Sequence, residues 1–257
     1  MKKIFVMLSF VMFFATSFHK SEIQPKQNPT VPLKTLPQLS VTNGEKSSKT
    51  NNAINAEEIY ASINFESINK LNPDVFNKAF LGFNNLKKAG KLDENAHILS
   101  ICDFSLSSTH KRLWVIDLNE KKVLFNSLVA HGKNTGEEFA QKFSNTESSY
   151  QSSLGFYITE TTYNGENGYS LKLLGMDKGF NDNALRRAIV MHGADYVSED
   201  FIKTQNRIGR SWGCPAVPRA LAEPIINTIK GKNCFFIYYP DRQYLSSSEW
   251  LKNQEEM

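Results

Sequence analysis

The chain has 257 residues, of which 40% are hydrophobic and 22% are charged, and its formal net charge is +4. These proportions are typical of a globular protein and allow a sizeable core. The small positive charge gathers in no dense basic patch and in no basic stripe interleaved with aromatic residues, so we expect no nucleic-acid partner. The 18 phenylalanines favour a core rich in strands.

The N-terminus has the pattern of a secretory signal peptide. Lys2 and Lys3 precede an apolar run over residues 4–15, and two small residues follow the run. The run is shorter than the roughly 20 apolar residues that a membrane-spanning helix requires. We therefore expect residues 1–18 to be a signal peptide and the protein to be exported to the periplasm or cell envelope. An uncleaved leader is the alternative, and it would be the expected attachment to a membrane.

The segment that follows the leader is polar. Residues 19–54 contain four prolines and many Asn, Ser, Thr and Lys residues. A segment of this composition cannot bury a core, and it predicts a flexible linker.

Two helices are expected next, over residues 55–95. Asn55 is a candidate N-cap for a helix from Ala56 to about Ile68. Asn72 and Pro73 then have the pattern of a second N-cap followed by proline at the first helical position, and Gly90 ends that helix. We expect this N-terminal helical segment to pack against the main domain.

From His97 onward the hydrophobic period becomes that of strands. Many short strands with glycine-rich turns predict a mainly β fold with peripheral helices, in the form of a β-sandwich or barrel-like core, over residues 96–245. One further helix is expected over residues 221–229. The predicted strands span residues 97–104, 112–118, 122–130, 155–163, 169–174, 188–192 and 234–239.

The three cysteines differ in their sequence settings. Cys102 and Cys234 lie in apolar runs and are interpreted as buried, inert thiols, with a disulfide between them as the alternative. Cys214 lies between Gly213 and Pro215, in a segment without the period of a helix or a strand. An odd number of cysteines in an exported protein leaves at least one without an intrachain partner, and Cys214 is the thiol of interest.

His192 and Cys214 form a candidate catalytic pair. His192 ends an apolar strand and is followed by Gly193. Acyl transfer by a thiol requires the thiolate, and a cysteine with a pKa of about 8.5 is mostly protonated at neutral pH. A neighbouring imidazole accepts that proton and then returns it to the leaving amine. The backbone N–H groups of Gly213 and Cys214 are the expected donors to the developing oxyanion.

The order of these residues resembles the L,D-transpeptidase catalytic domain family (YkuD type). The family pattern is His-Gly, a variable loop, and then Ser/Thr-His-Gly-Cys, in which His192 and Gly193 match the first part. Ser211, Gly213 and Cys214 match the second part. The run GRSWGCPAV is similar to a divergent branch with the signature Gly-Arg-Ser-x-Gly-Cys-Pro-Ala-Val. The resemblance implies an L,D-transpeptidase-like β-sandwich over roughly residues 96–240.

Several positions depart from the family pattern. Trp212 replaces the usual His before Gly-Cys, and Ala216 replaces the usual Arg two residues after the cysteine. Arg210 and Arg219 are candidates for supplying that charge, and Arg210 is taken as a candidate substrate-binding residue. Trp212 is expected to form a wall of the substrate cleft. His131 belongs to a second His-Gly pair and is interpreted either as a substrate-cleft residue or as a surface loop histidine without a role.

The resemblance implies a reaction and its partners. Cys214 would attack the carbonyl that precedes the terminal D-alanine of a peptidoglycan stem peptide, and an amine acceptor would resolve the thioester. Water as the acceptor would make the same site an L,D-carboxypeptidase. The resemblance implies no metal and no organic cofactor. It also implies that the carbonyl of Gly193 orients His192, with Ser211 as the second candidate.

Other interpretations stay open at this point. The chain could be another cysteine peptidase or amidase of the cell wall, or a non-catalytic wall-binding protein that keeps the fold. A zinc site of His131, His192 and Cys214 has little support because closely spaced ligand pairs are absent from the sequence. Arg186 and Arg187 precede the strand of His192 and are interpreted as solvated or structural, with binding of a stem-peptide carboxylate as the alternative.

Overall fold

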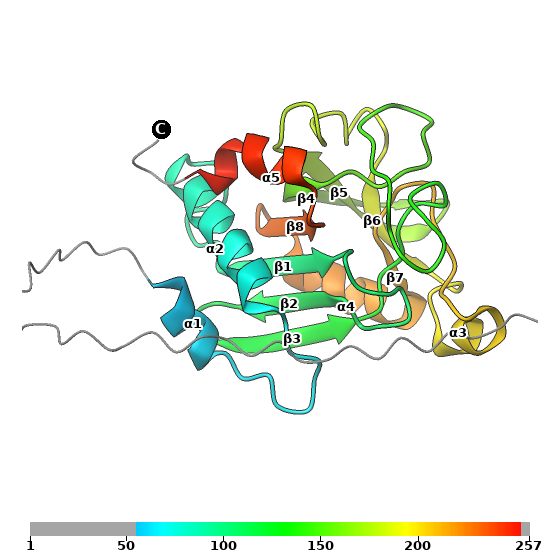
Figure 1. Ribbon diagram of the computed structural model, residues 1–257, viewed down its shortest axis with the longest axis horizontal. Helices are drawn as coiled ribbons and strands as arrows, with labels where there is room; N and C mark the ends of the chain where they lie inside the picture. Colours follow the sequence, from blue (N-terminus) through cyan, green and yellow to red (C-terminus); the bar gives the residue numbers. More distant parts are fainter. Residues whose placement is uncertain (1–54, 253–257) are drawn as a thin grey trace, which may run out of the picture. The chain divides into compact units, whose positions relative to one another are not determined.

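The structure is a computed structural model, and it describes residues 55–252 (Figure 1). The expected signal peptide and linker, residues 1–54, lie outside the described residues. Within the described range no helix has the length and apolar character needed to cross a membrane.

Strands and helices alternate irregularly along the described chain. The strands are β1 (Ile98–Asp103), β2 (Leu113–Asp117), β3 (Lys122–Ser127), β4 (Gly155–Gly165), β5 (Gly168–Gly175), β6 (Val190–Ala194), β7 (Ala216–Pro218) and β8 (Cys234–Tyr238). The helices are α1 (Ala56–Ser62), α2 (Pro73–Lys88), α3 (Glu199–Gln205), α4 (Arg219–Ile229), α5 (Arg242–Ser247) and the 3₁₀ turn η1 (Glu249–Leu251).

The strands form one mixed sheet whose two ends are bridged. Their order is β3-β2-β1-β8-β4-β5-β6-β7, with β1–β8 and β6–β7 parallel and the other neighbours antiparallel. The chain that leaves β3 reaches β7, where the N–H of Ala130 donates to the carbonyl oxygen of Ala216 at 2.8 Å. This contact brings the sheet close to a closed barrel. The predicted mainly β fold with peripheral helices is confirmed.

Two helices cover much of the sheet. α2 packs against β1 and β8, and α4 packs against β1, β5 and β6. In Figure 1, α2 and α5 lie above the β1–β3 part of the sheet, and α1 and α3 lie at opposite ends of the described domain. Gly82 permits the close approach of α2, because a Cβ atom there would lie 2.0 Å from the ring of Phe156. That ring is itself stacked on Phe236 of β8 with centroids 4.1 Å apart.

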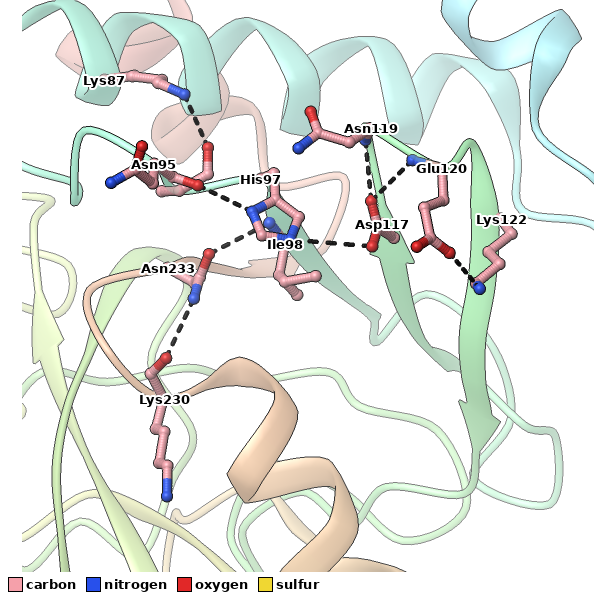
Figure 2. A network of polar contacts seen from close by, with 11 residues as sticks. Lys87, Asn95, His97, Ile98, Asp117, Asn119, Glu120, Lys122, Lys230 and Asn233 are labelled. Atoms are coloured by element: carbon pink, nitrogen blue, oxygen red, sulfur yellow. Dashed lines mark hydrogen bonds and ion pairs between the residues drawn. The ribbon is translucent and has the colours of Figure 1, made fainter.

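A polar network fixes the ends of β1 and β2 (Figure 2). Asn233 accepts from the N–H of Ile98 at 3.1 Å and donates to the carbonyl oxygen of Lys230 at 3.1 Å, which ties β1 to the turn after α4. His97 approaches Asp117 of β2 at 3.8 Å. These contacts fix the register at the end of the sheet opposite the segments that carry His192 and Cys214.

The first helix is shorter than predicted. The second helix begins at Pro73, and the Oδ1 atom of Asn72 accepts from the N–H of Asp74 at 2.8 Å, as expected for an N-cap. The first was expected to extend to about Ile68 but ends at Ser62. The chain leaves it because Asn64 forms a bridge with β3, its N–H donating to the carbonyl oxygen of Lys121 at 3.1 Å.

Two strand predictions near the candidate site need correction. The strand expected over residues 122–130 ends at Ser127, because the following residues pair with β7 instead of β2. The strand expected over residues 188–192 begins only at Val190, because Ala188 has a φ of 52°, a left-handed conformation that interrupts a strand.

The two core cysteines are buried and free. Cys102 of β1 and Cys234 of β8 are both fully buried, and neither takes part in a disulfide. The interpretation of both residues as buried core thiols is confirmed, and the alternative disulfide is not present.

Asp177 is a buried carboxyl group that ties the C-terminal helices to β4. Its oxygens accept from the N–H of Phe156 at 2.7 Å, from the hydroxyl of Ser248 and from the hydroxyl of Tyr244 at 3.4 Å. Burial raises its pKa to about 6, although the hydrogen bonds from Ser248, Phe156 and Tyr244 oppose the shift.

This pKa predicts a pH-dependent stability. Between about pH 4 and about pH 6 the folded chain holds a proton on Asp177 that the unfolded chain has lost, so the free energy of unfolding falls as the pH rises. The shift of about two units corresponds to about 3 kcal/mol at most. Asp177→Asn should flatten this slope in urea denaturation, whereas Glu166→Gln, at an exposed turn, should leave it unchanged. An identical slope in Asp177→Asn would contradict the prediction.

Candidate active site

The pairing of β6 with β7 brings the two candidate catalytic segments together. The strands are parallel, and His192 lies opposite Ala216. Since neighbouring strands are about 4.8 Å apart, the turn that precedes Ala216 runs beside the strand that carries His192. Cys214 lies on that turn, near the start of β6, and its Sγ atom donates to the carbonyl oxygen of Ala188 at 3.7 Å.

His192 is buried and its ring is oriented by its own chain neighbour. The side chain is 4% exposed, and Nδ1 lies 3.1 Å from the carbonyl oxygen of Gly193. A carbonyl oxygen only accepts, so this contact assigns the proton to Nδ1 and leaves the lone pair on Nε2. The contact agrees with the expectation that Gly193 orients the imidazole. Burial lowers the pKa of His192 and the charge of Arg219 lowers it further, against the opposing effect of the hydrogen bond to Gly193.

Glycine at position 193 also permits close packing of α4 on β6. A Cβ atom there would lie 2.9 Å from the Cβ atom of Ala222 and 3.1 Å from the Cα atom of Arg219. Any larger residue would displace the first turn of α4, which follows β7 directly. Gly193 therefore fixes both the ring of His192 and the helix beside it.

Ser211 closes the turn that carries Cys214. Its hydroxyl donates to the carbonyl oxygen of Cys214 at 2.6 Å and accepts from the N–H of Gly213 at 3.0 Å. Ser211 thus acts within the turn, and not on His192 as the second candidate for orienting the ring. The N–H of Gly213 was expected to bind an oxyanion, and this expectation needs correction because Ser211 already accepts from it.

Gly213 has a conformation that favours glycine. Its φ is +126°, and a Cβ atom there would lie 2.7 Å from the carbonyl oxygen of Gln151. The hydroxyl of Ser152 donates to the carbonyl oxygen of Gly213 at 3.3 Å and accepts from the N–H of Gly132 at 3.0 Å. The turn therefore rests on two neighbouring segments that are distant in sequence.

Arg187 holds one of those segments and supplies positive charge near the thiol. Its guanidinium donates to the carbonyl oxygens of Ser144 at 2.8 Å and Gln151 at 2.7 Å, and to the hydroxyl of Ser149 at 3.1 Å. The structural interpretation of Arg187 therefore agrees with its contacts. Arg186 forms an exposed ion pair with Glu147.

The thiol of Cys214 is half-buried and protonated at neutral pH. Burial raises its pKa, and the backbone N–H of Val190 and the charge of Arg187 oppose this shift only in part. Because the pKa of His192 is lowered, the resting site holds a neutral thiol and a neutral imidazole. In this state the thiol is hydrogen-bonded to Ala188.

The family model described as the L,D-transpeptidase catalytic domain matches residues 67–238. The chain belongs to this family. The matched range begins before α2 and ends in β8, so the family domain includes both segments of the candidate site and the larger N-terminal helix. No curated protein matches the chain.

Several solved structures are similar to the L,D-transpeptidase domain described here. An L,D-transpeptidase from Mycobacterium smegmatis is 11% identical with a TM-score of 0.35, and the match covers 56% of this chain and 59% of that chain. One from Mycobacterium tuberculosis H37Rv is 13% identical with a TM-score of 0.33, covering 56% and 58%. The helical cell shape determining protein Pgp2 from Campylobacter jejuni is 14% identical with a TM-score of 0.35, covering 63% and 57%. The matches span less than two thirds of each of these chains, and the family assignment rests on the family model alone.

His131 lies beneath the surface of the L,D-transpeptidase domain. It is 1% exposed, accepts at Nδ1 from Arg112 at 2.8 Å and donates at Nε2 to the carbonyl oxygen of Gly136 at 3.2 Å. Burial, followed by the charge of Arg112, lowers its pKa to about 3. The interpretations of His131 as a cleft residue and as a surface histidine are both corrected: it is a buried support for the loop after β3.

The contacts of His131 also bear on the zinc interpretation. Both ring nitrogens of His131 are hydrogen-bonded, and residues 55–252 contain no group of three or more His, Cys, Asp or Glu side chains arranged to hold a metal ion.

Arg210 ties the same loop to the turn of the nucleophile. Its Nη1 atom donates to Glu137 at 2.6 Å and to the carbonyl oxygens of Lys133 at 3.0 Å and Gly136 at 3.1 Å. Arg219 pairs with Asp195 at 2.6 Å. These ion pairs do not favour either arginine as a free anchor for a substrate.

Trp212 is the most exposed aromatic side chain beside the thiol. It is 72% exposed, and its ring meets that of Tyr150 edge-on with centroids 5.7 Å apart. The ammonium group of Lys133 lies 4.1 Å from the ring centroid of Tyr150 and 5.7 Å from that of Trp212. The contact of Lys133 with these rings is not predictable from the sequence, because nothing in the local sequence of Lys133 indicates it.

The raised pKa of Cys214 predicts slow alkylation at neutral pH. The rate of reaction with iodoacetamide should rise with pH and reach its midpoint above the ordinary value of about 8.5. Arg187→Met removes a charge that stabilises the thiolate, so the midpoint of alkylation should move to still higher pH in this variant. Arg187→Lys keeps the charge and should bring the midpoint part of the way back toward the wild-type value. Alkylation at Cys214 is measured by peptide mass spectrometry, with Arg186→Met as the matched control. A wild-type midpoint at or below about 8.5 would contradict the assignment.

Proposed function

We propose that the protein is a peptidoglycan L,D-transpeptidase in which Cys214 is the nucleophile and His192 is the general base. One observation carries the proposal: the register of β6 and β7 aligns the turn of a half-buried thiol with a strand whose histidine is oriented through Nδ1. The family match over residues 67–238 supports acyl transfer as the reaction class.

The first half of the reaction forms a thioester. The thiol exchanges its hydrogen bond with Ala188 for one with Nε2 of His192, which accepts the proton as the sulfur attacks the carbonyl carbon before the terminal D-alanine. The N–H of Cys214 is the remaining candidate donor to the oxyanion, because that of Gly213 is occupied by Ser211. Collapse of the tetrahedral intermediate breaks the peptide bond, and the imidazolium gives its proton to the leaving amine of D-alanine.

The second half transfers the acyl group. An amine of a second stem peptide attacks the thioester, His192 accepts the proton lost by that amine, and the thiolate leaves and regains a proton from the imidazolium. The product is a new amide bond that links two stem peptides. Water in place of the amine gives the shortened peptide of an L,D-carboxypeptidase from the same intermediate.

The proposal includes where the protein acts and how it is organised. A peptidoglycan substrate requires action in the periplasm or cell envelope, and the signal-peptide pattern over residues 1–18 supports export. Residues 19–54 would then link this leader to the helical segment 55–95 and the catalytic domain 96–245.

Product analysis tests the proposed reaction. The whole chain is incubated with disaccharide-tetrapeptide muropeptides, and the products are measured by mass spectrometry. Release of D-alanine together with a dimer is expected, and Cys214→Ala and His192→Ala should lower the rate by at least about a hundredfold. Cys102→Ala removes a thiol of the core and serves as the control.

The outcomes separate the candidate functions. Release of D-alanine without a dimer would identify the carboxypeptidase. Unchanged muropeptides in all samples would contradict the stem-peptide assignment and favour another cysteine peptidase or amidase, or a wall-binding protein.

The lowered pKa of His192 predicts activity in mild acid. The imidazole must be neutral to accept a proton, so the acidic limb of kcat/KM should lie below the ordinary imidazole value of about 6.5. Arg219→Met removes a charge that lowers this pKa, and its acidic limb should move to higher pH. The exposed Arg242→Met is the control. A wild-type limb at or above about 6.5 would contradict the derived state of His192.

A further inference from the structure

Most cations around the candidate site are neutralised by carboxylates. Glu137 pairs with both Arg207 at 3.1 Å and Arg210 at 2.6 Å. Asp195 pairs with Arg219 at 2.6 Å. A charge that is already paired loses an ion pair when it binds an anionic ligand, so these arginines are poor anchors for one.

Lys133 differs from these arginines in its surroundings. It is exposed, and its ammonium group lies over the rings of Tyr150 and Trp212 instead of beside a carboxylate. Among the ion pairs between described residues, none includes Lys133. A cation on an aromatic face keeps N–H donors directed away from the ring, and these can bind an anion.

The main chain fixes Lys133 beside the turn of the nucleophile. Its N–H donates to the carbonyl oxygen of Ser211 at 2.8 Å, and its own carbonyl oxygen accepts from Arg210 at 3.0 Å. Trp212, which the ammonium faces, precedes Cys214 by two residues. Lys133 is therefore tied to the segment that carries Cys214 by its backbone contact with Ser211 and by the contact of its ammonium group with the ring of Trp212.

Tyr150, which belongs to this cluster, has a left-handed backbone conformation. Its φ is 55°, an uncommon value for a residue with a side chain. The N–H of Asn134 donates to the carbonyl oxygen of Tyr150 at 3.1 Å and stabilises this conformation. Non-glycine residues keep such a conformation only where surrounding contacts offset its strain. They are found more often at active sites and ligand-binding sites than elsewhere.

We propose that Lys133, held by Tyr150 and Trp212, binds a free carboxylate of the acyl-donor peptide and thereby selects donors that carry one. This inference rests on the proposed transpeptidase function and adds the residue that determines donor specificity. The donor offers two sources of this chemistry, the C-terminal carboxylate of D-alanine and the side-chain carboxylate of the diamino acid. Ala216 has no charge, so the position two residues after the nucleophile supplies no competing cation.

Binding to Cys214→Ala tests the proposal without turnover. Trp114 and Trp250 are 1% and 7% exposed, so quenching of tryptophan fluorescence by acrylamide reports mainly on Trp212. Three tetrapeptides are titrated while this quenching is followed: one with both carboxylates free, one amidated at the C-terminus and one amidated at the diamino acid. Adding Lys133→Met should weaken binding of the free peptide about tenfold, as expected for loss of a charge-assisted hydrogen bond.

The amidated peptides identify which carboxylate is bound. One of them should bind the background chain about tenfold more weakly, and Lys133→Met should have no further effect on that peptide. Lys142→Met removes an exposed charge from the same loop and should leave all three affinities unchanged. If Lys133→Met lowered the affinity for all three peptides equally, or lowered it for none of them, the proposal would be overturned.

Turnover separates failure of this inference from failure of the proposed function. In a chain with Cys214 intact, Lys133→Met should raise KM for the free peptide about tenfold with little change in kcat, and Lys133→Arg should restore most of the loss. If D-alanine is released but KM does not change in Lys133→Met, the inference about Lys133 is overturned and the proposed function is not. Absence of Cys214-dependent release would contradict the proposed function, and with it the role given to Lys133.

Discussion

The candidate active site depends on a strand of three residues. β7 is paired with β6 on one side through His192 and Ala216, and on the other side the N–H of Ala130 donates to Ala216 at 2.8 Å. These contacts fix the residues immediately after Cys214. α4 begins directly after β7 and packs closely on Gly193, the residue after His192. The positions of the Cys214 turn, of His192 and of α4 are therefore fixed relative to one another. Loss of the β6–β7 pairing would separate the candidate nucleophile from its base.

Around this pairing, neutral hydrogen bonds supply rigidity and burial sets the charge state. Ser211 closes the turn, and glycine at position 213 permits the approach of the chain near Gln151. Burial raises the pKa of Cys214 and lowers that of His192, so both are neutral at rest. A protonated thiol is a weak nucleophile, and the proposed base, His192, lies on the strand that pairs with β7.

The sequence alone predicts those parts of the structure that local pattern determines. The helix after Asn72 has its N-cap and first-position proline, and the long apolar strands lie within a few residues of their predicted bounds. Three features depend on partners that are distant in sequence: the strand β7, the buried state of His131 and the position of the Lys133 side chain. β7 has three residues, too few to show the period of a strand. His131 is hydrogen-bonded to Arg112, and Lys133 contacts two rings elsewhere in the chain. The motif predicts His192 and Cys214 as the candidate pair, and this stays a prediction. Nothing in the local sequence indicates the hydrogen bond that occupies the N–H of Gly213.

The proposed reaction requires that an acyl group becomes attached to Cys214. The most direct measurement incubates the whole chain with a tetrapeptide donor in the absence of an acceptor amine, quenches with acid and locates the adduct by peptide mass spectrometry. We expect an added mass equal to the donor minus D-alanine on the peptide that contains Cys214, and no added mass on the peptides that contain the buried Cys102 or Cys234. Release of D-alanine with the adduct on another residue, or undiminished release by Cys214→Ala, would contradict it.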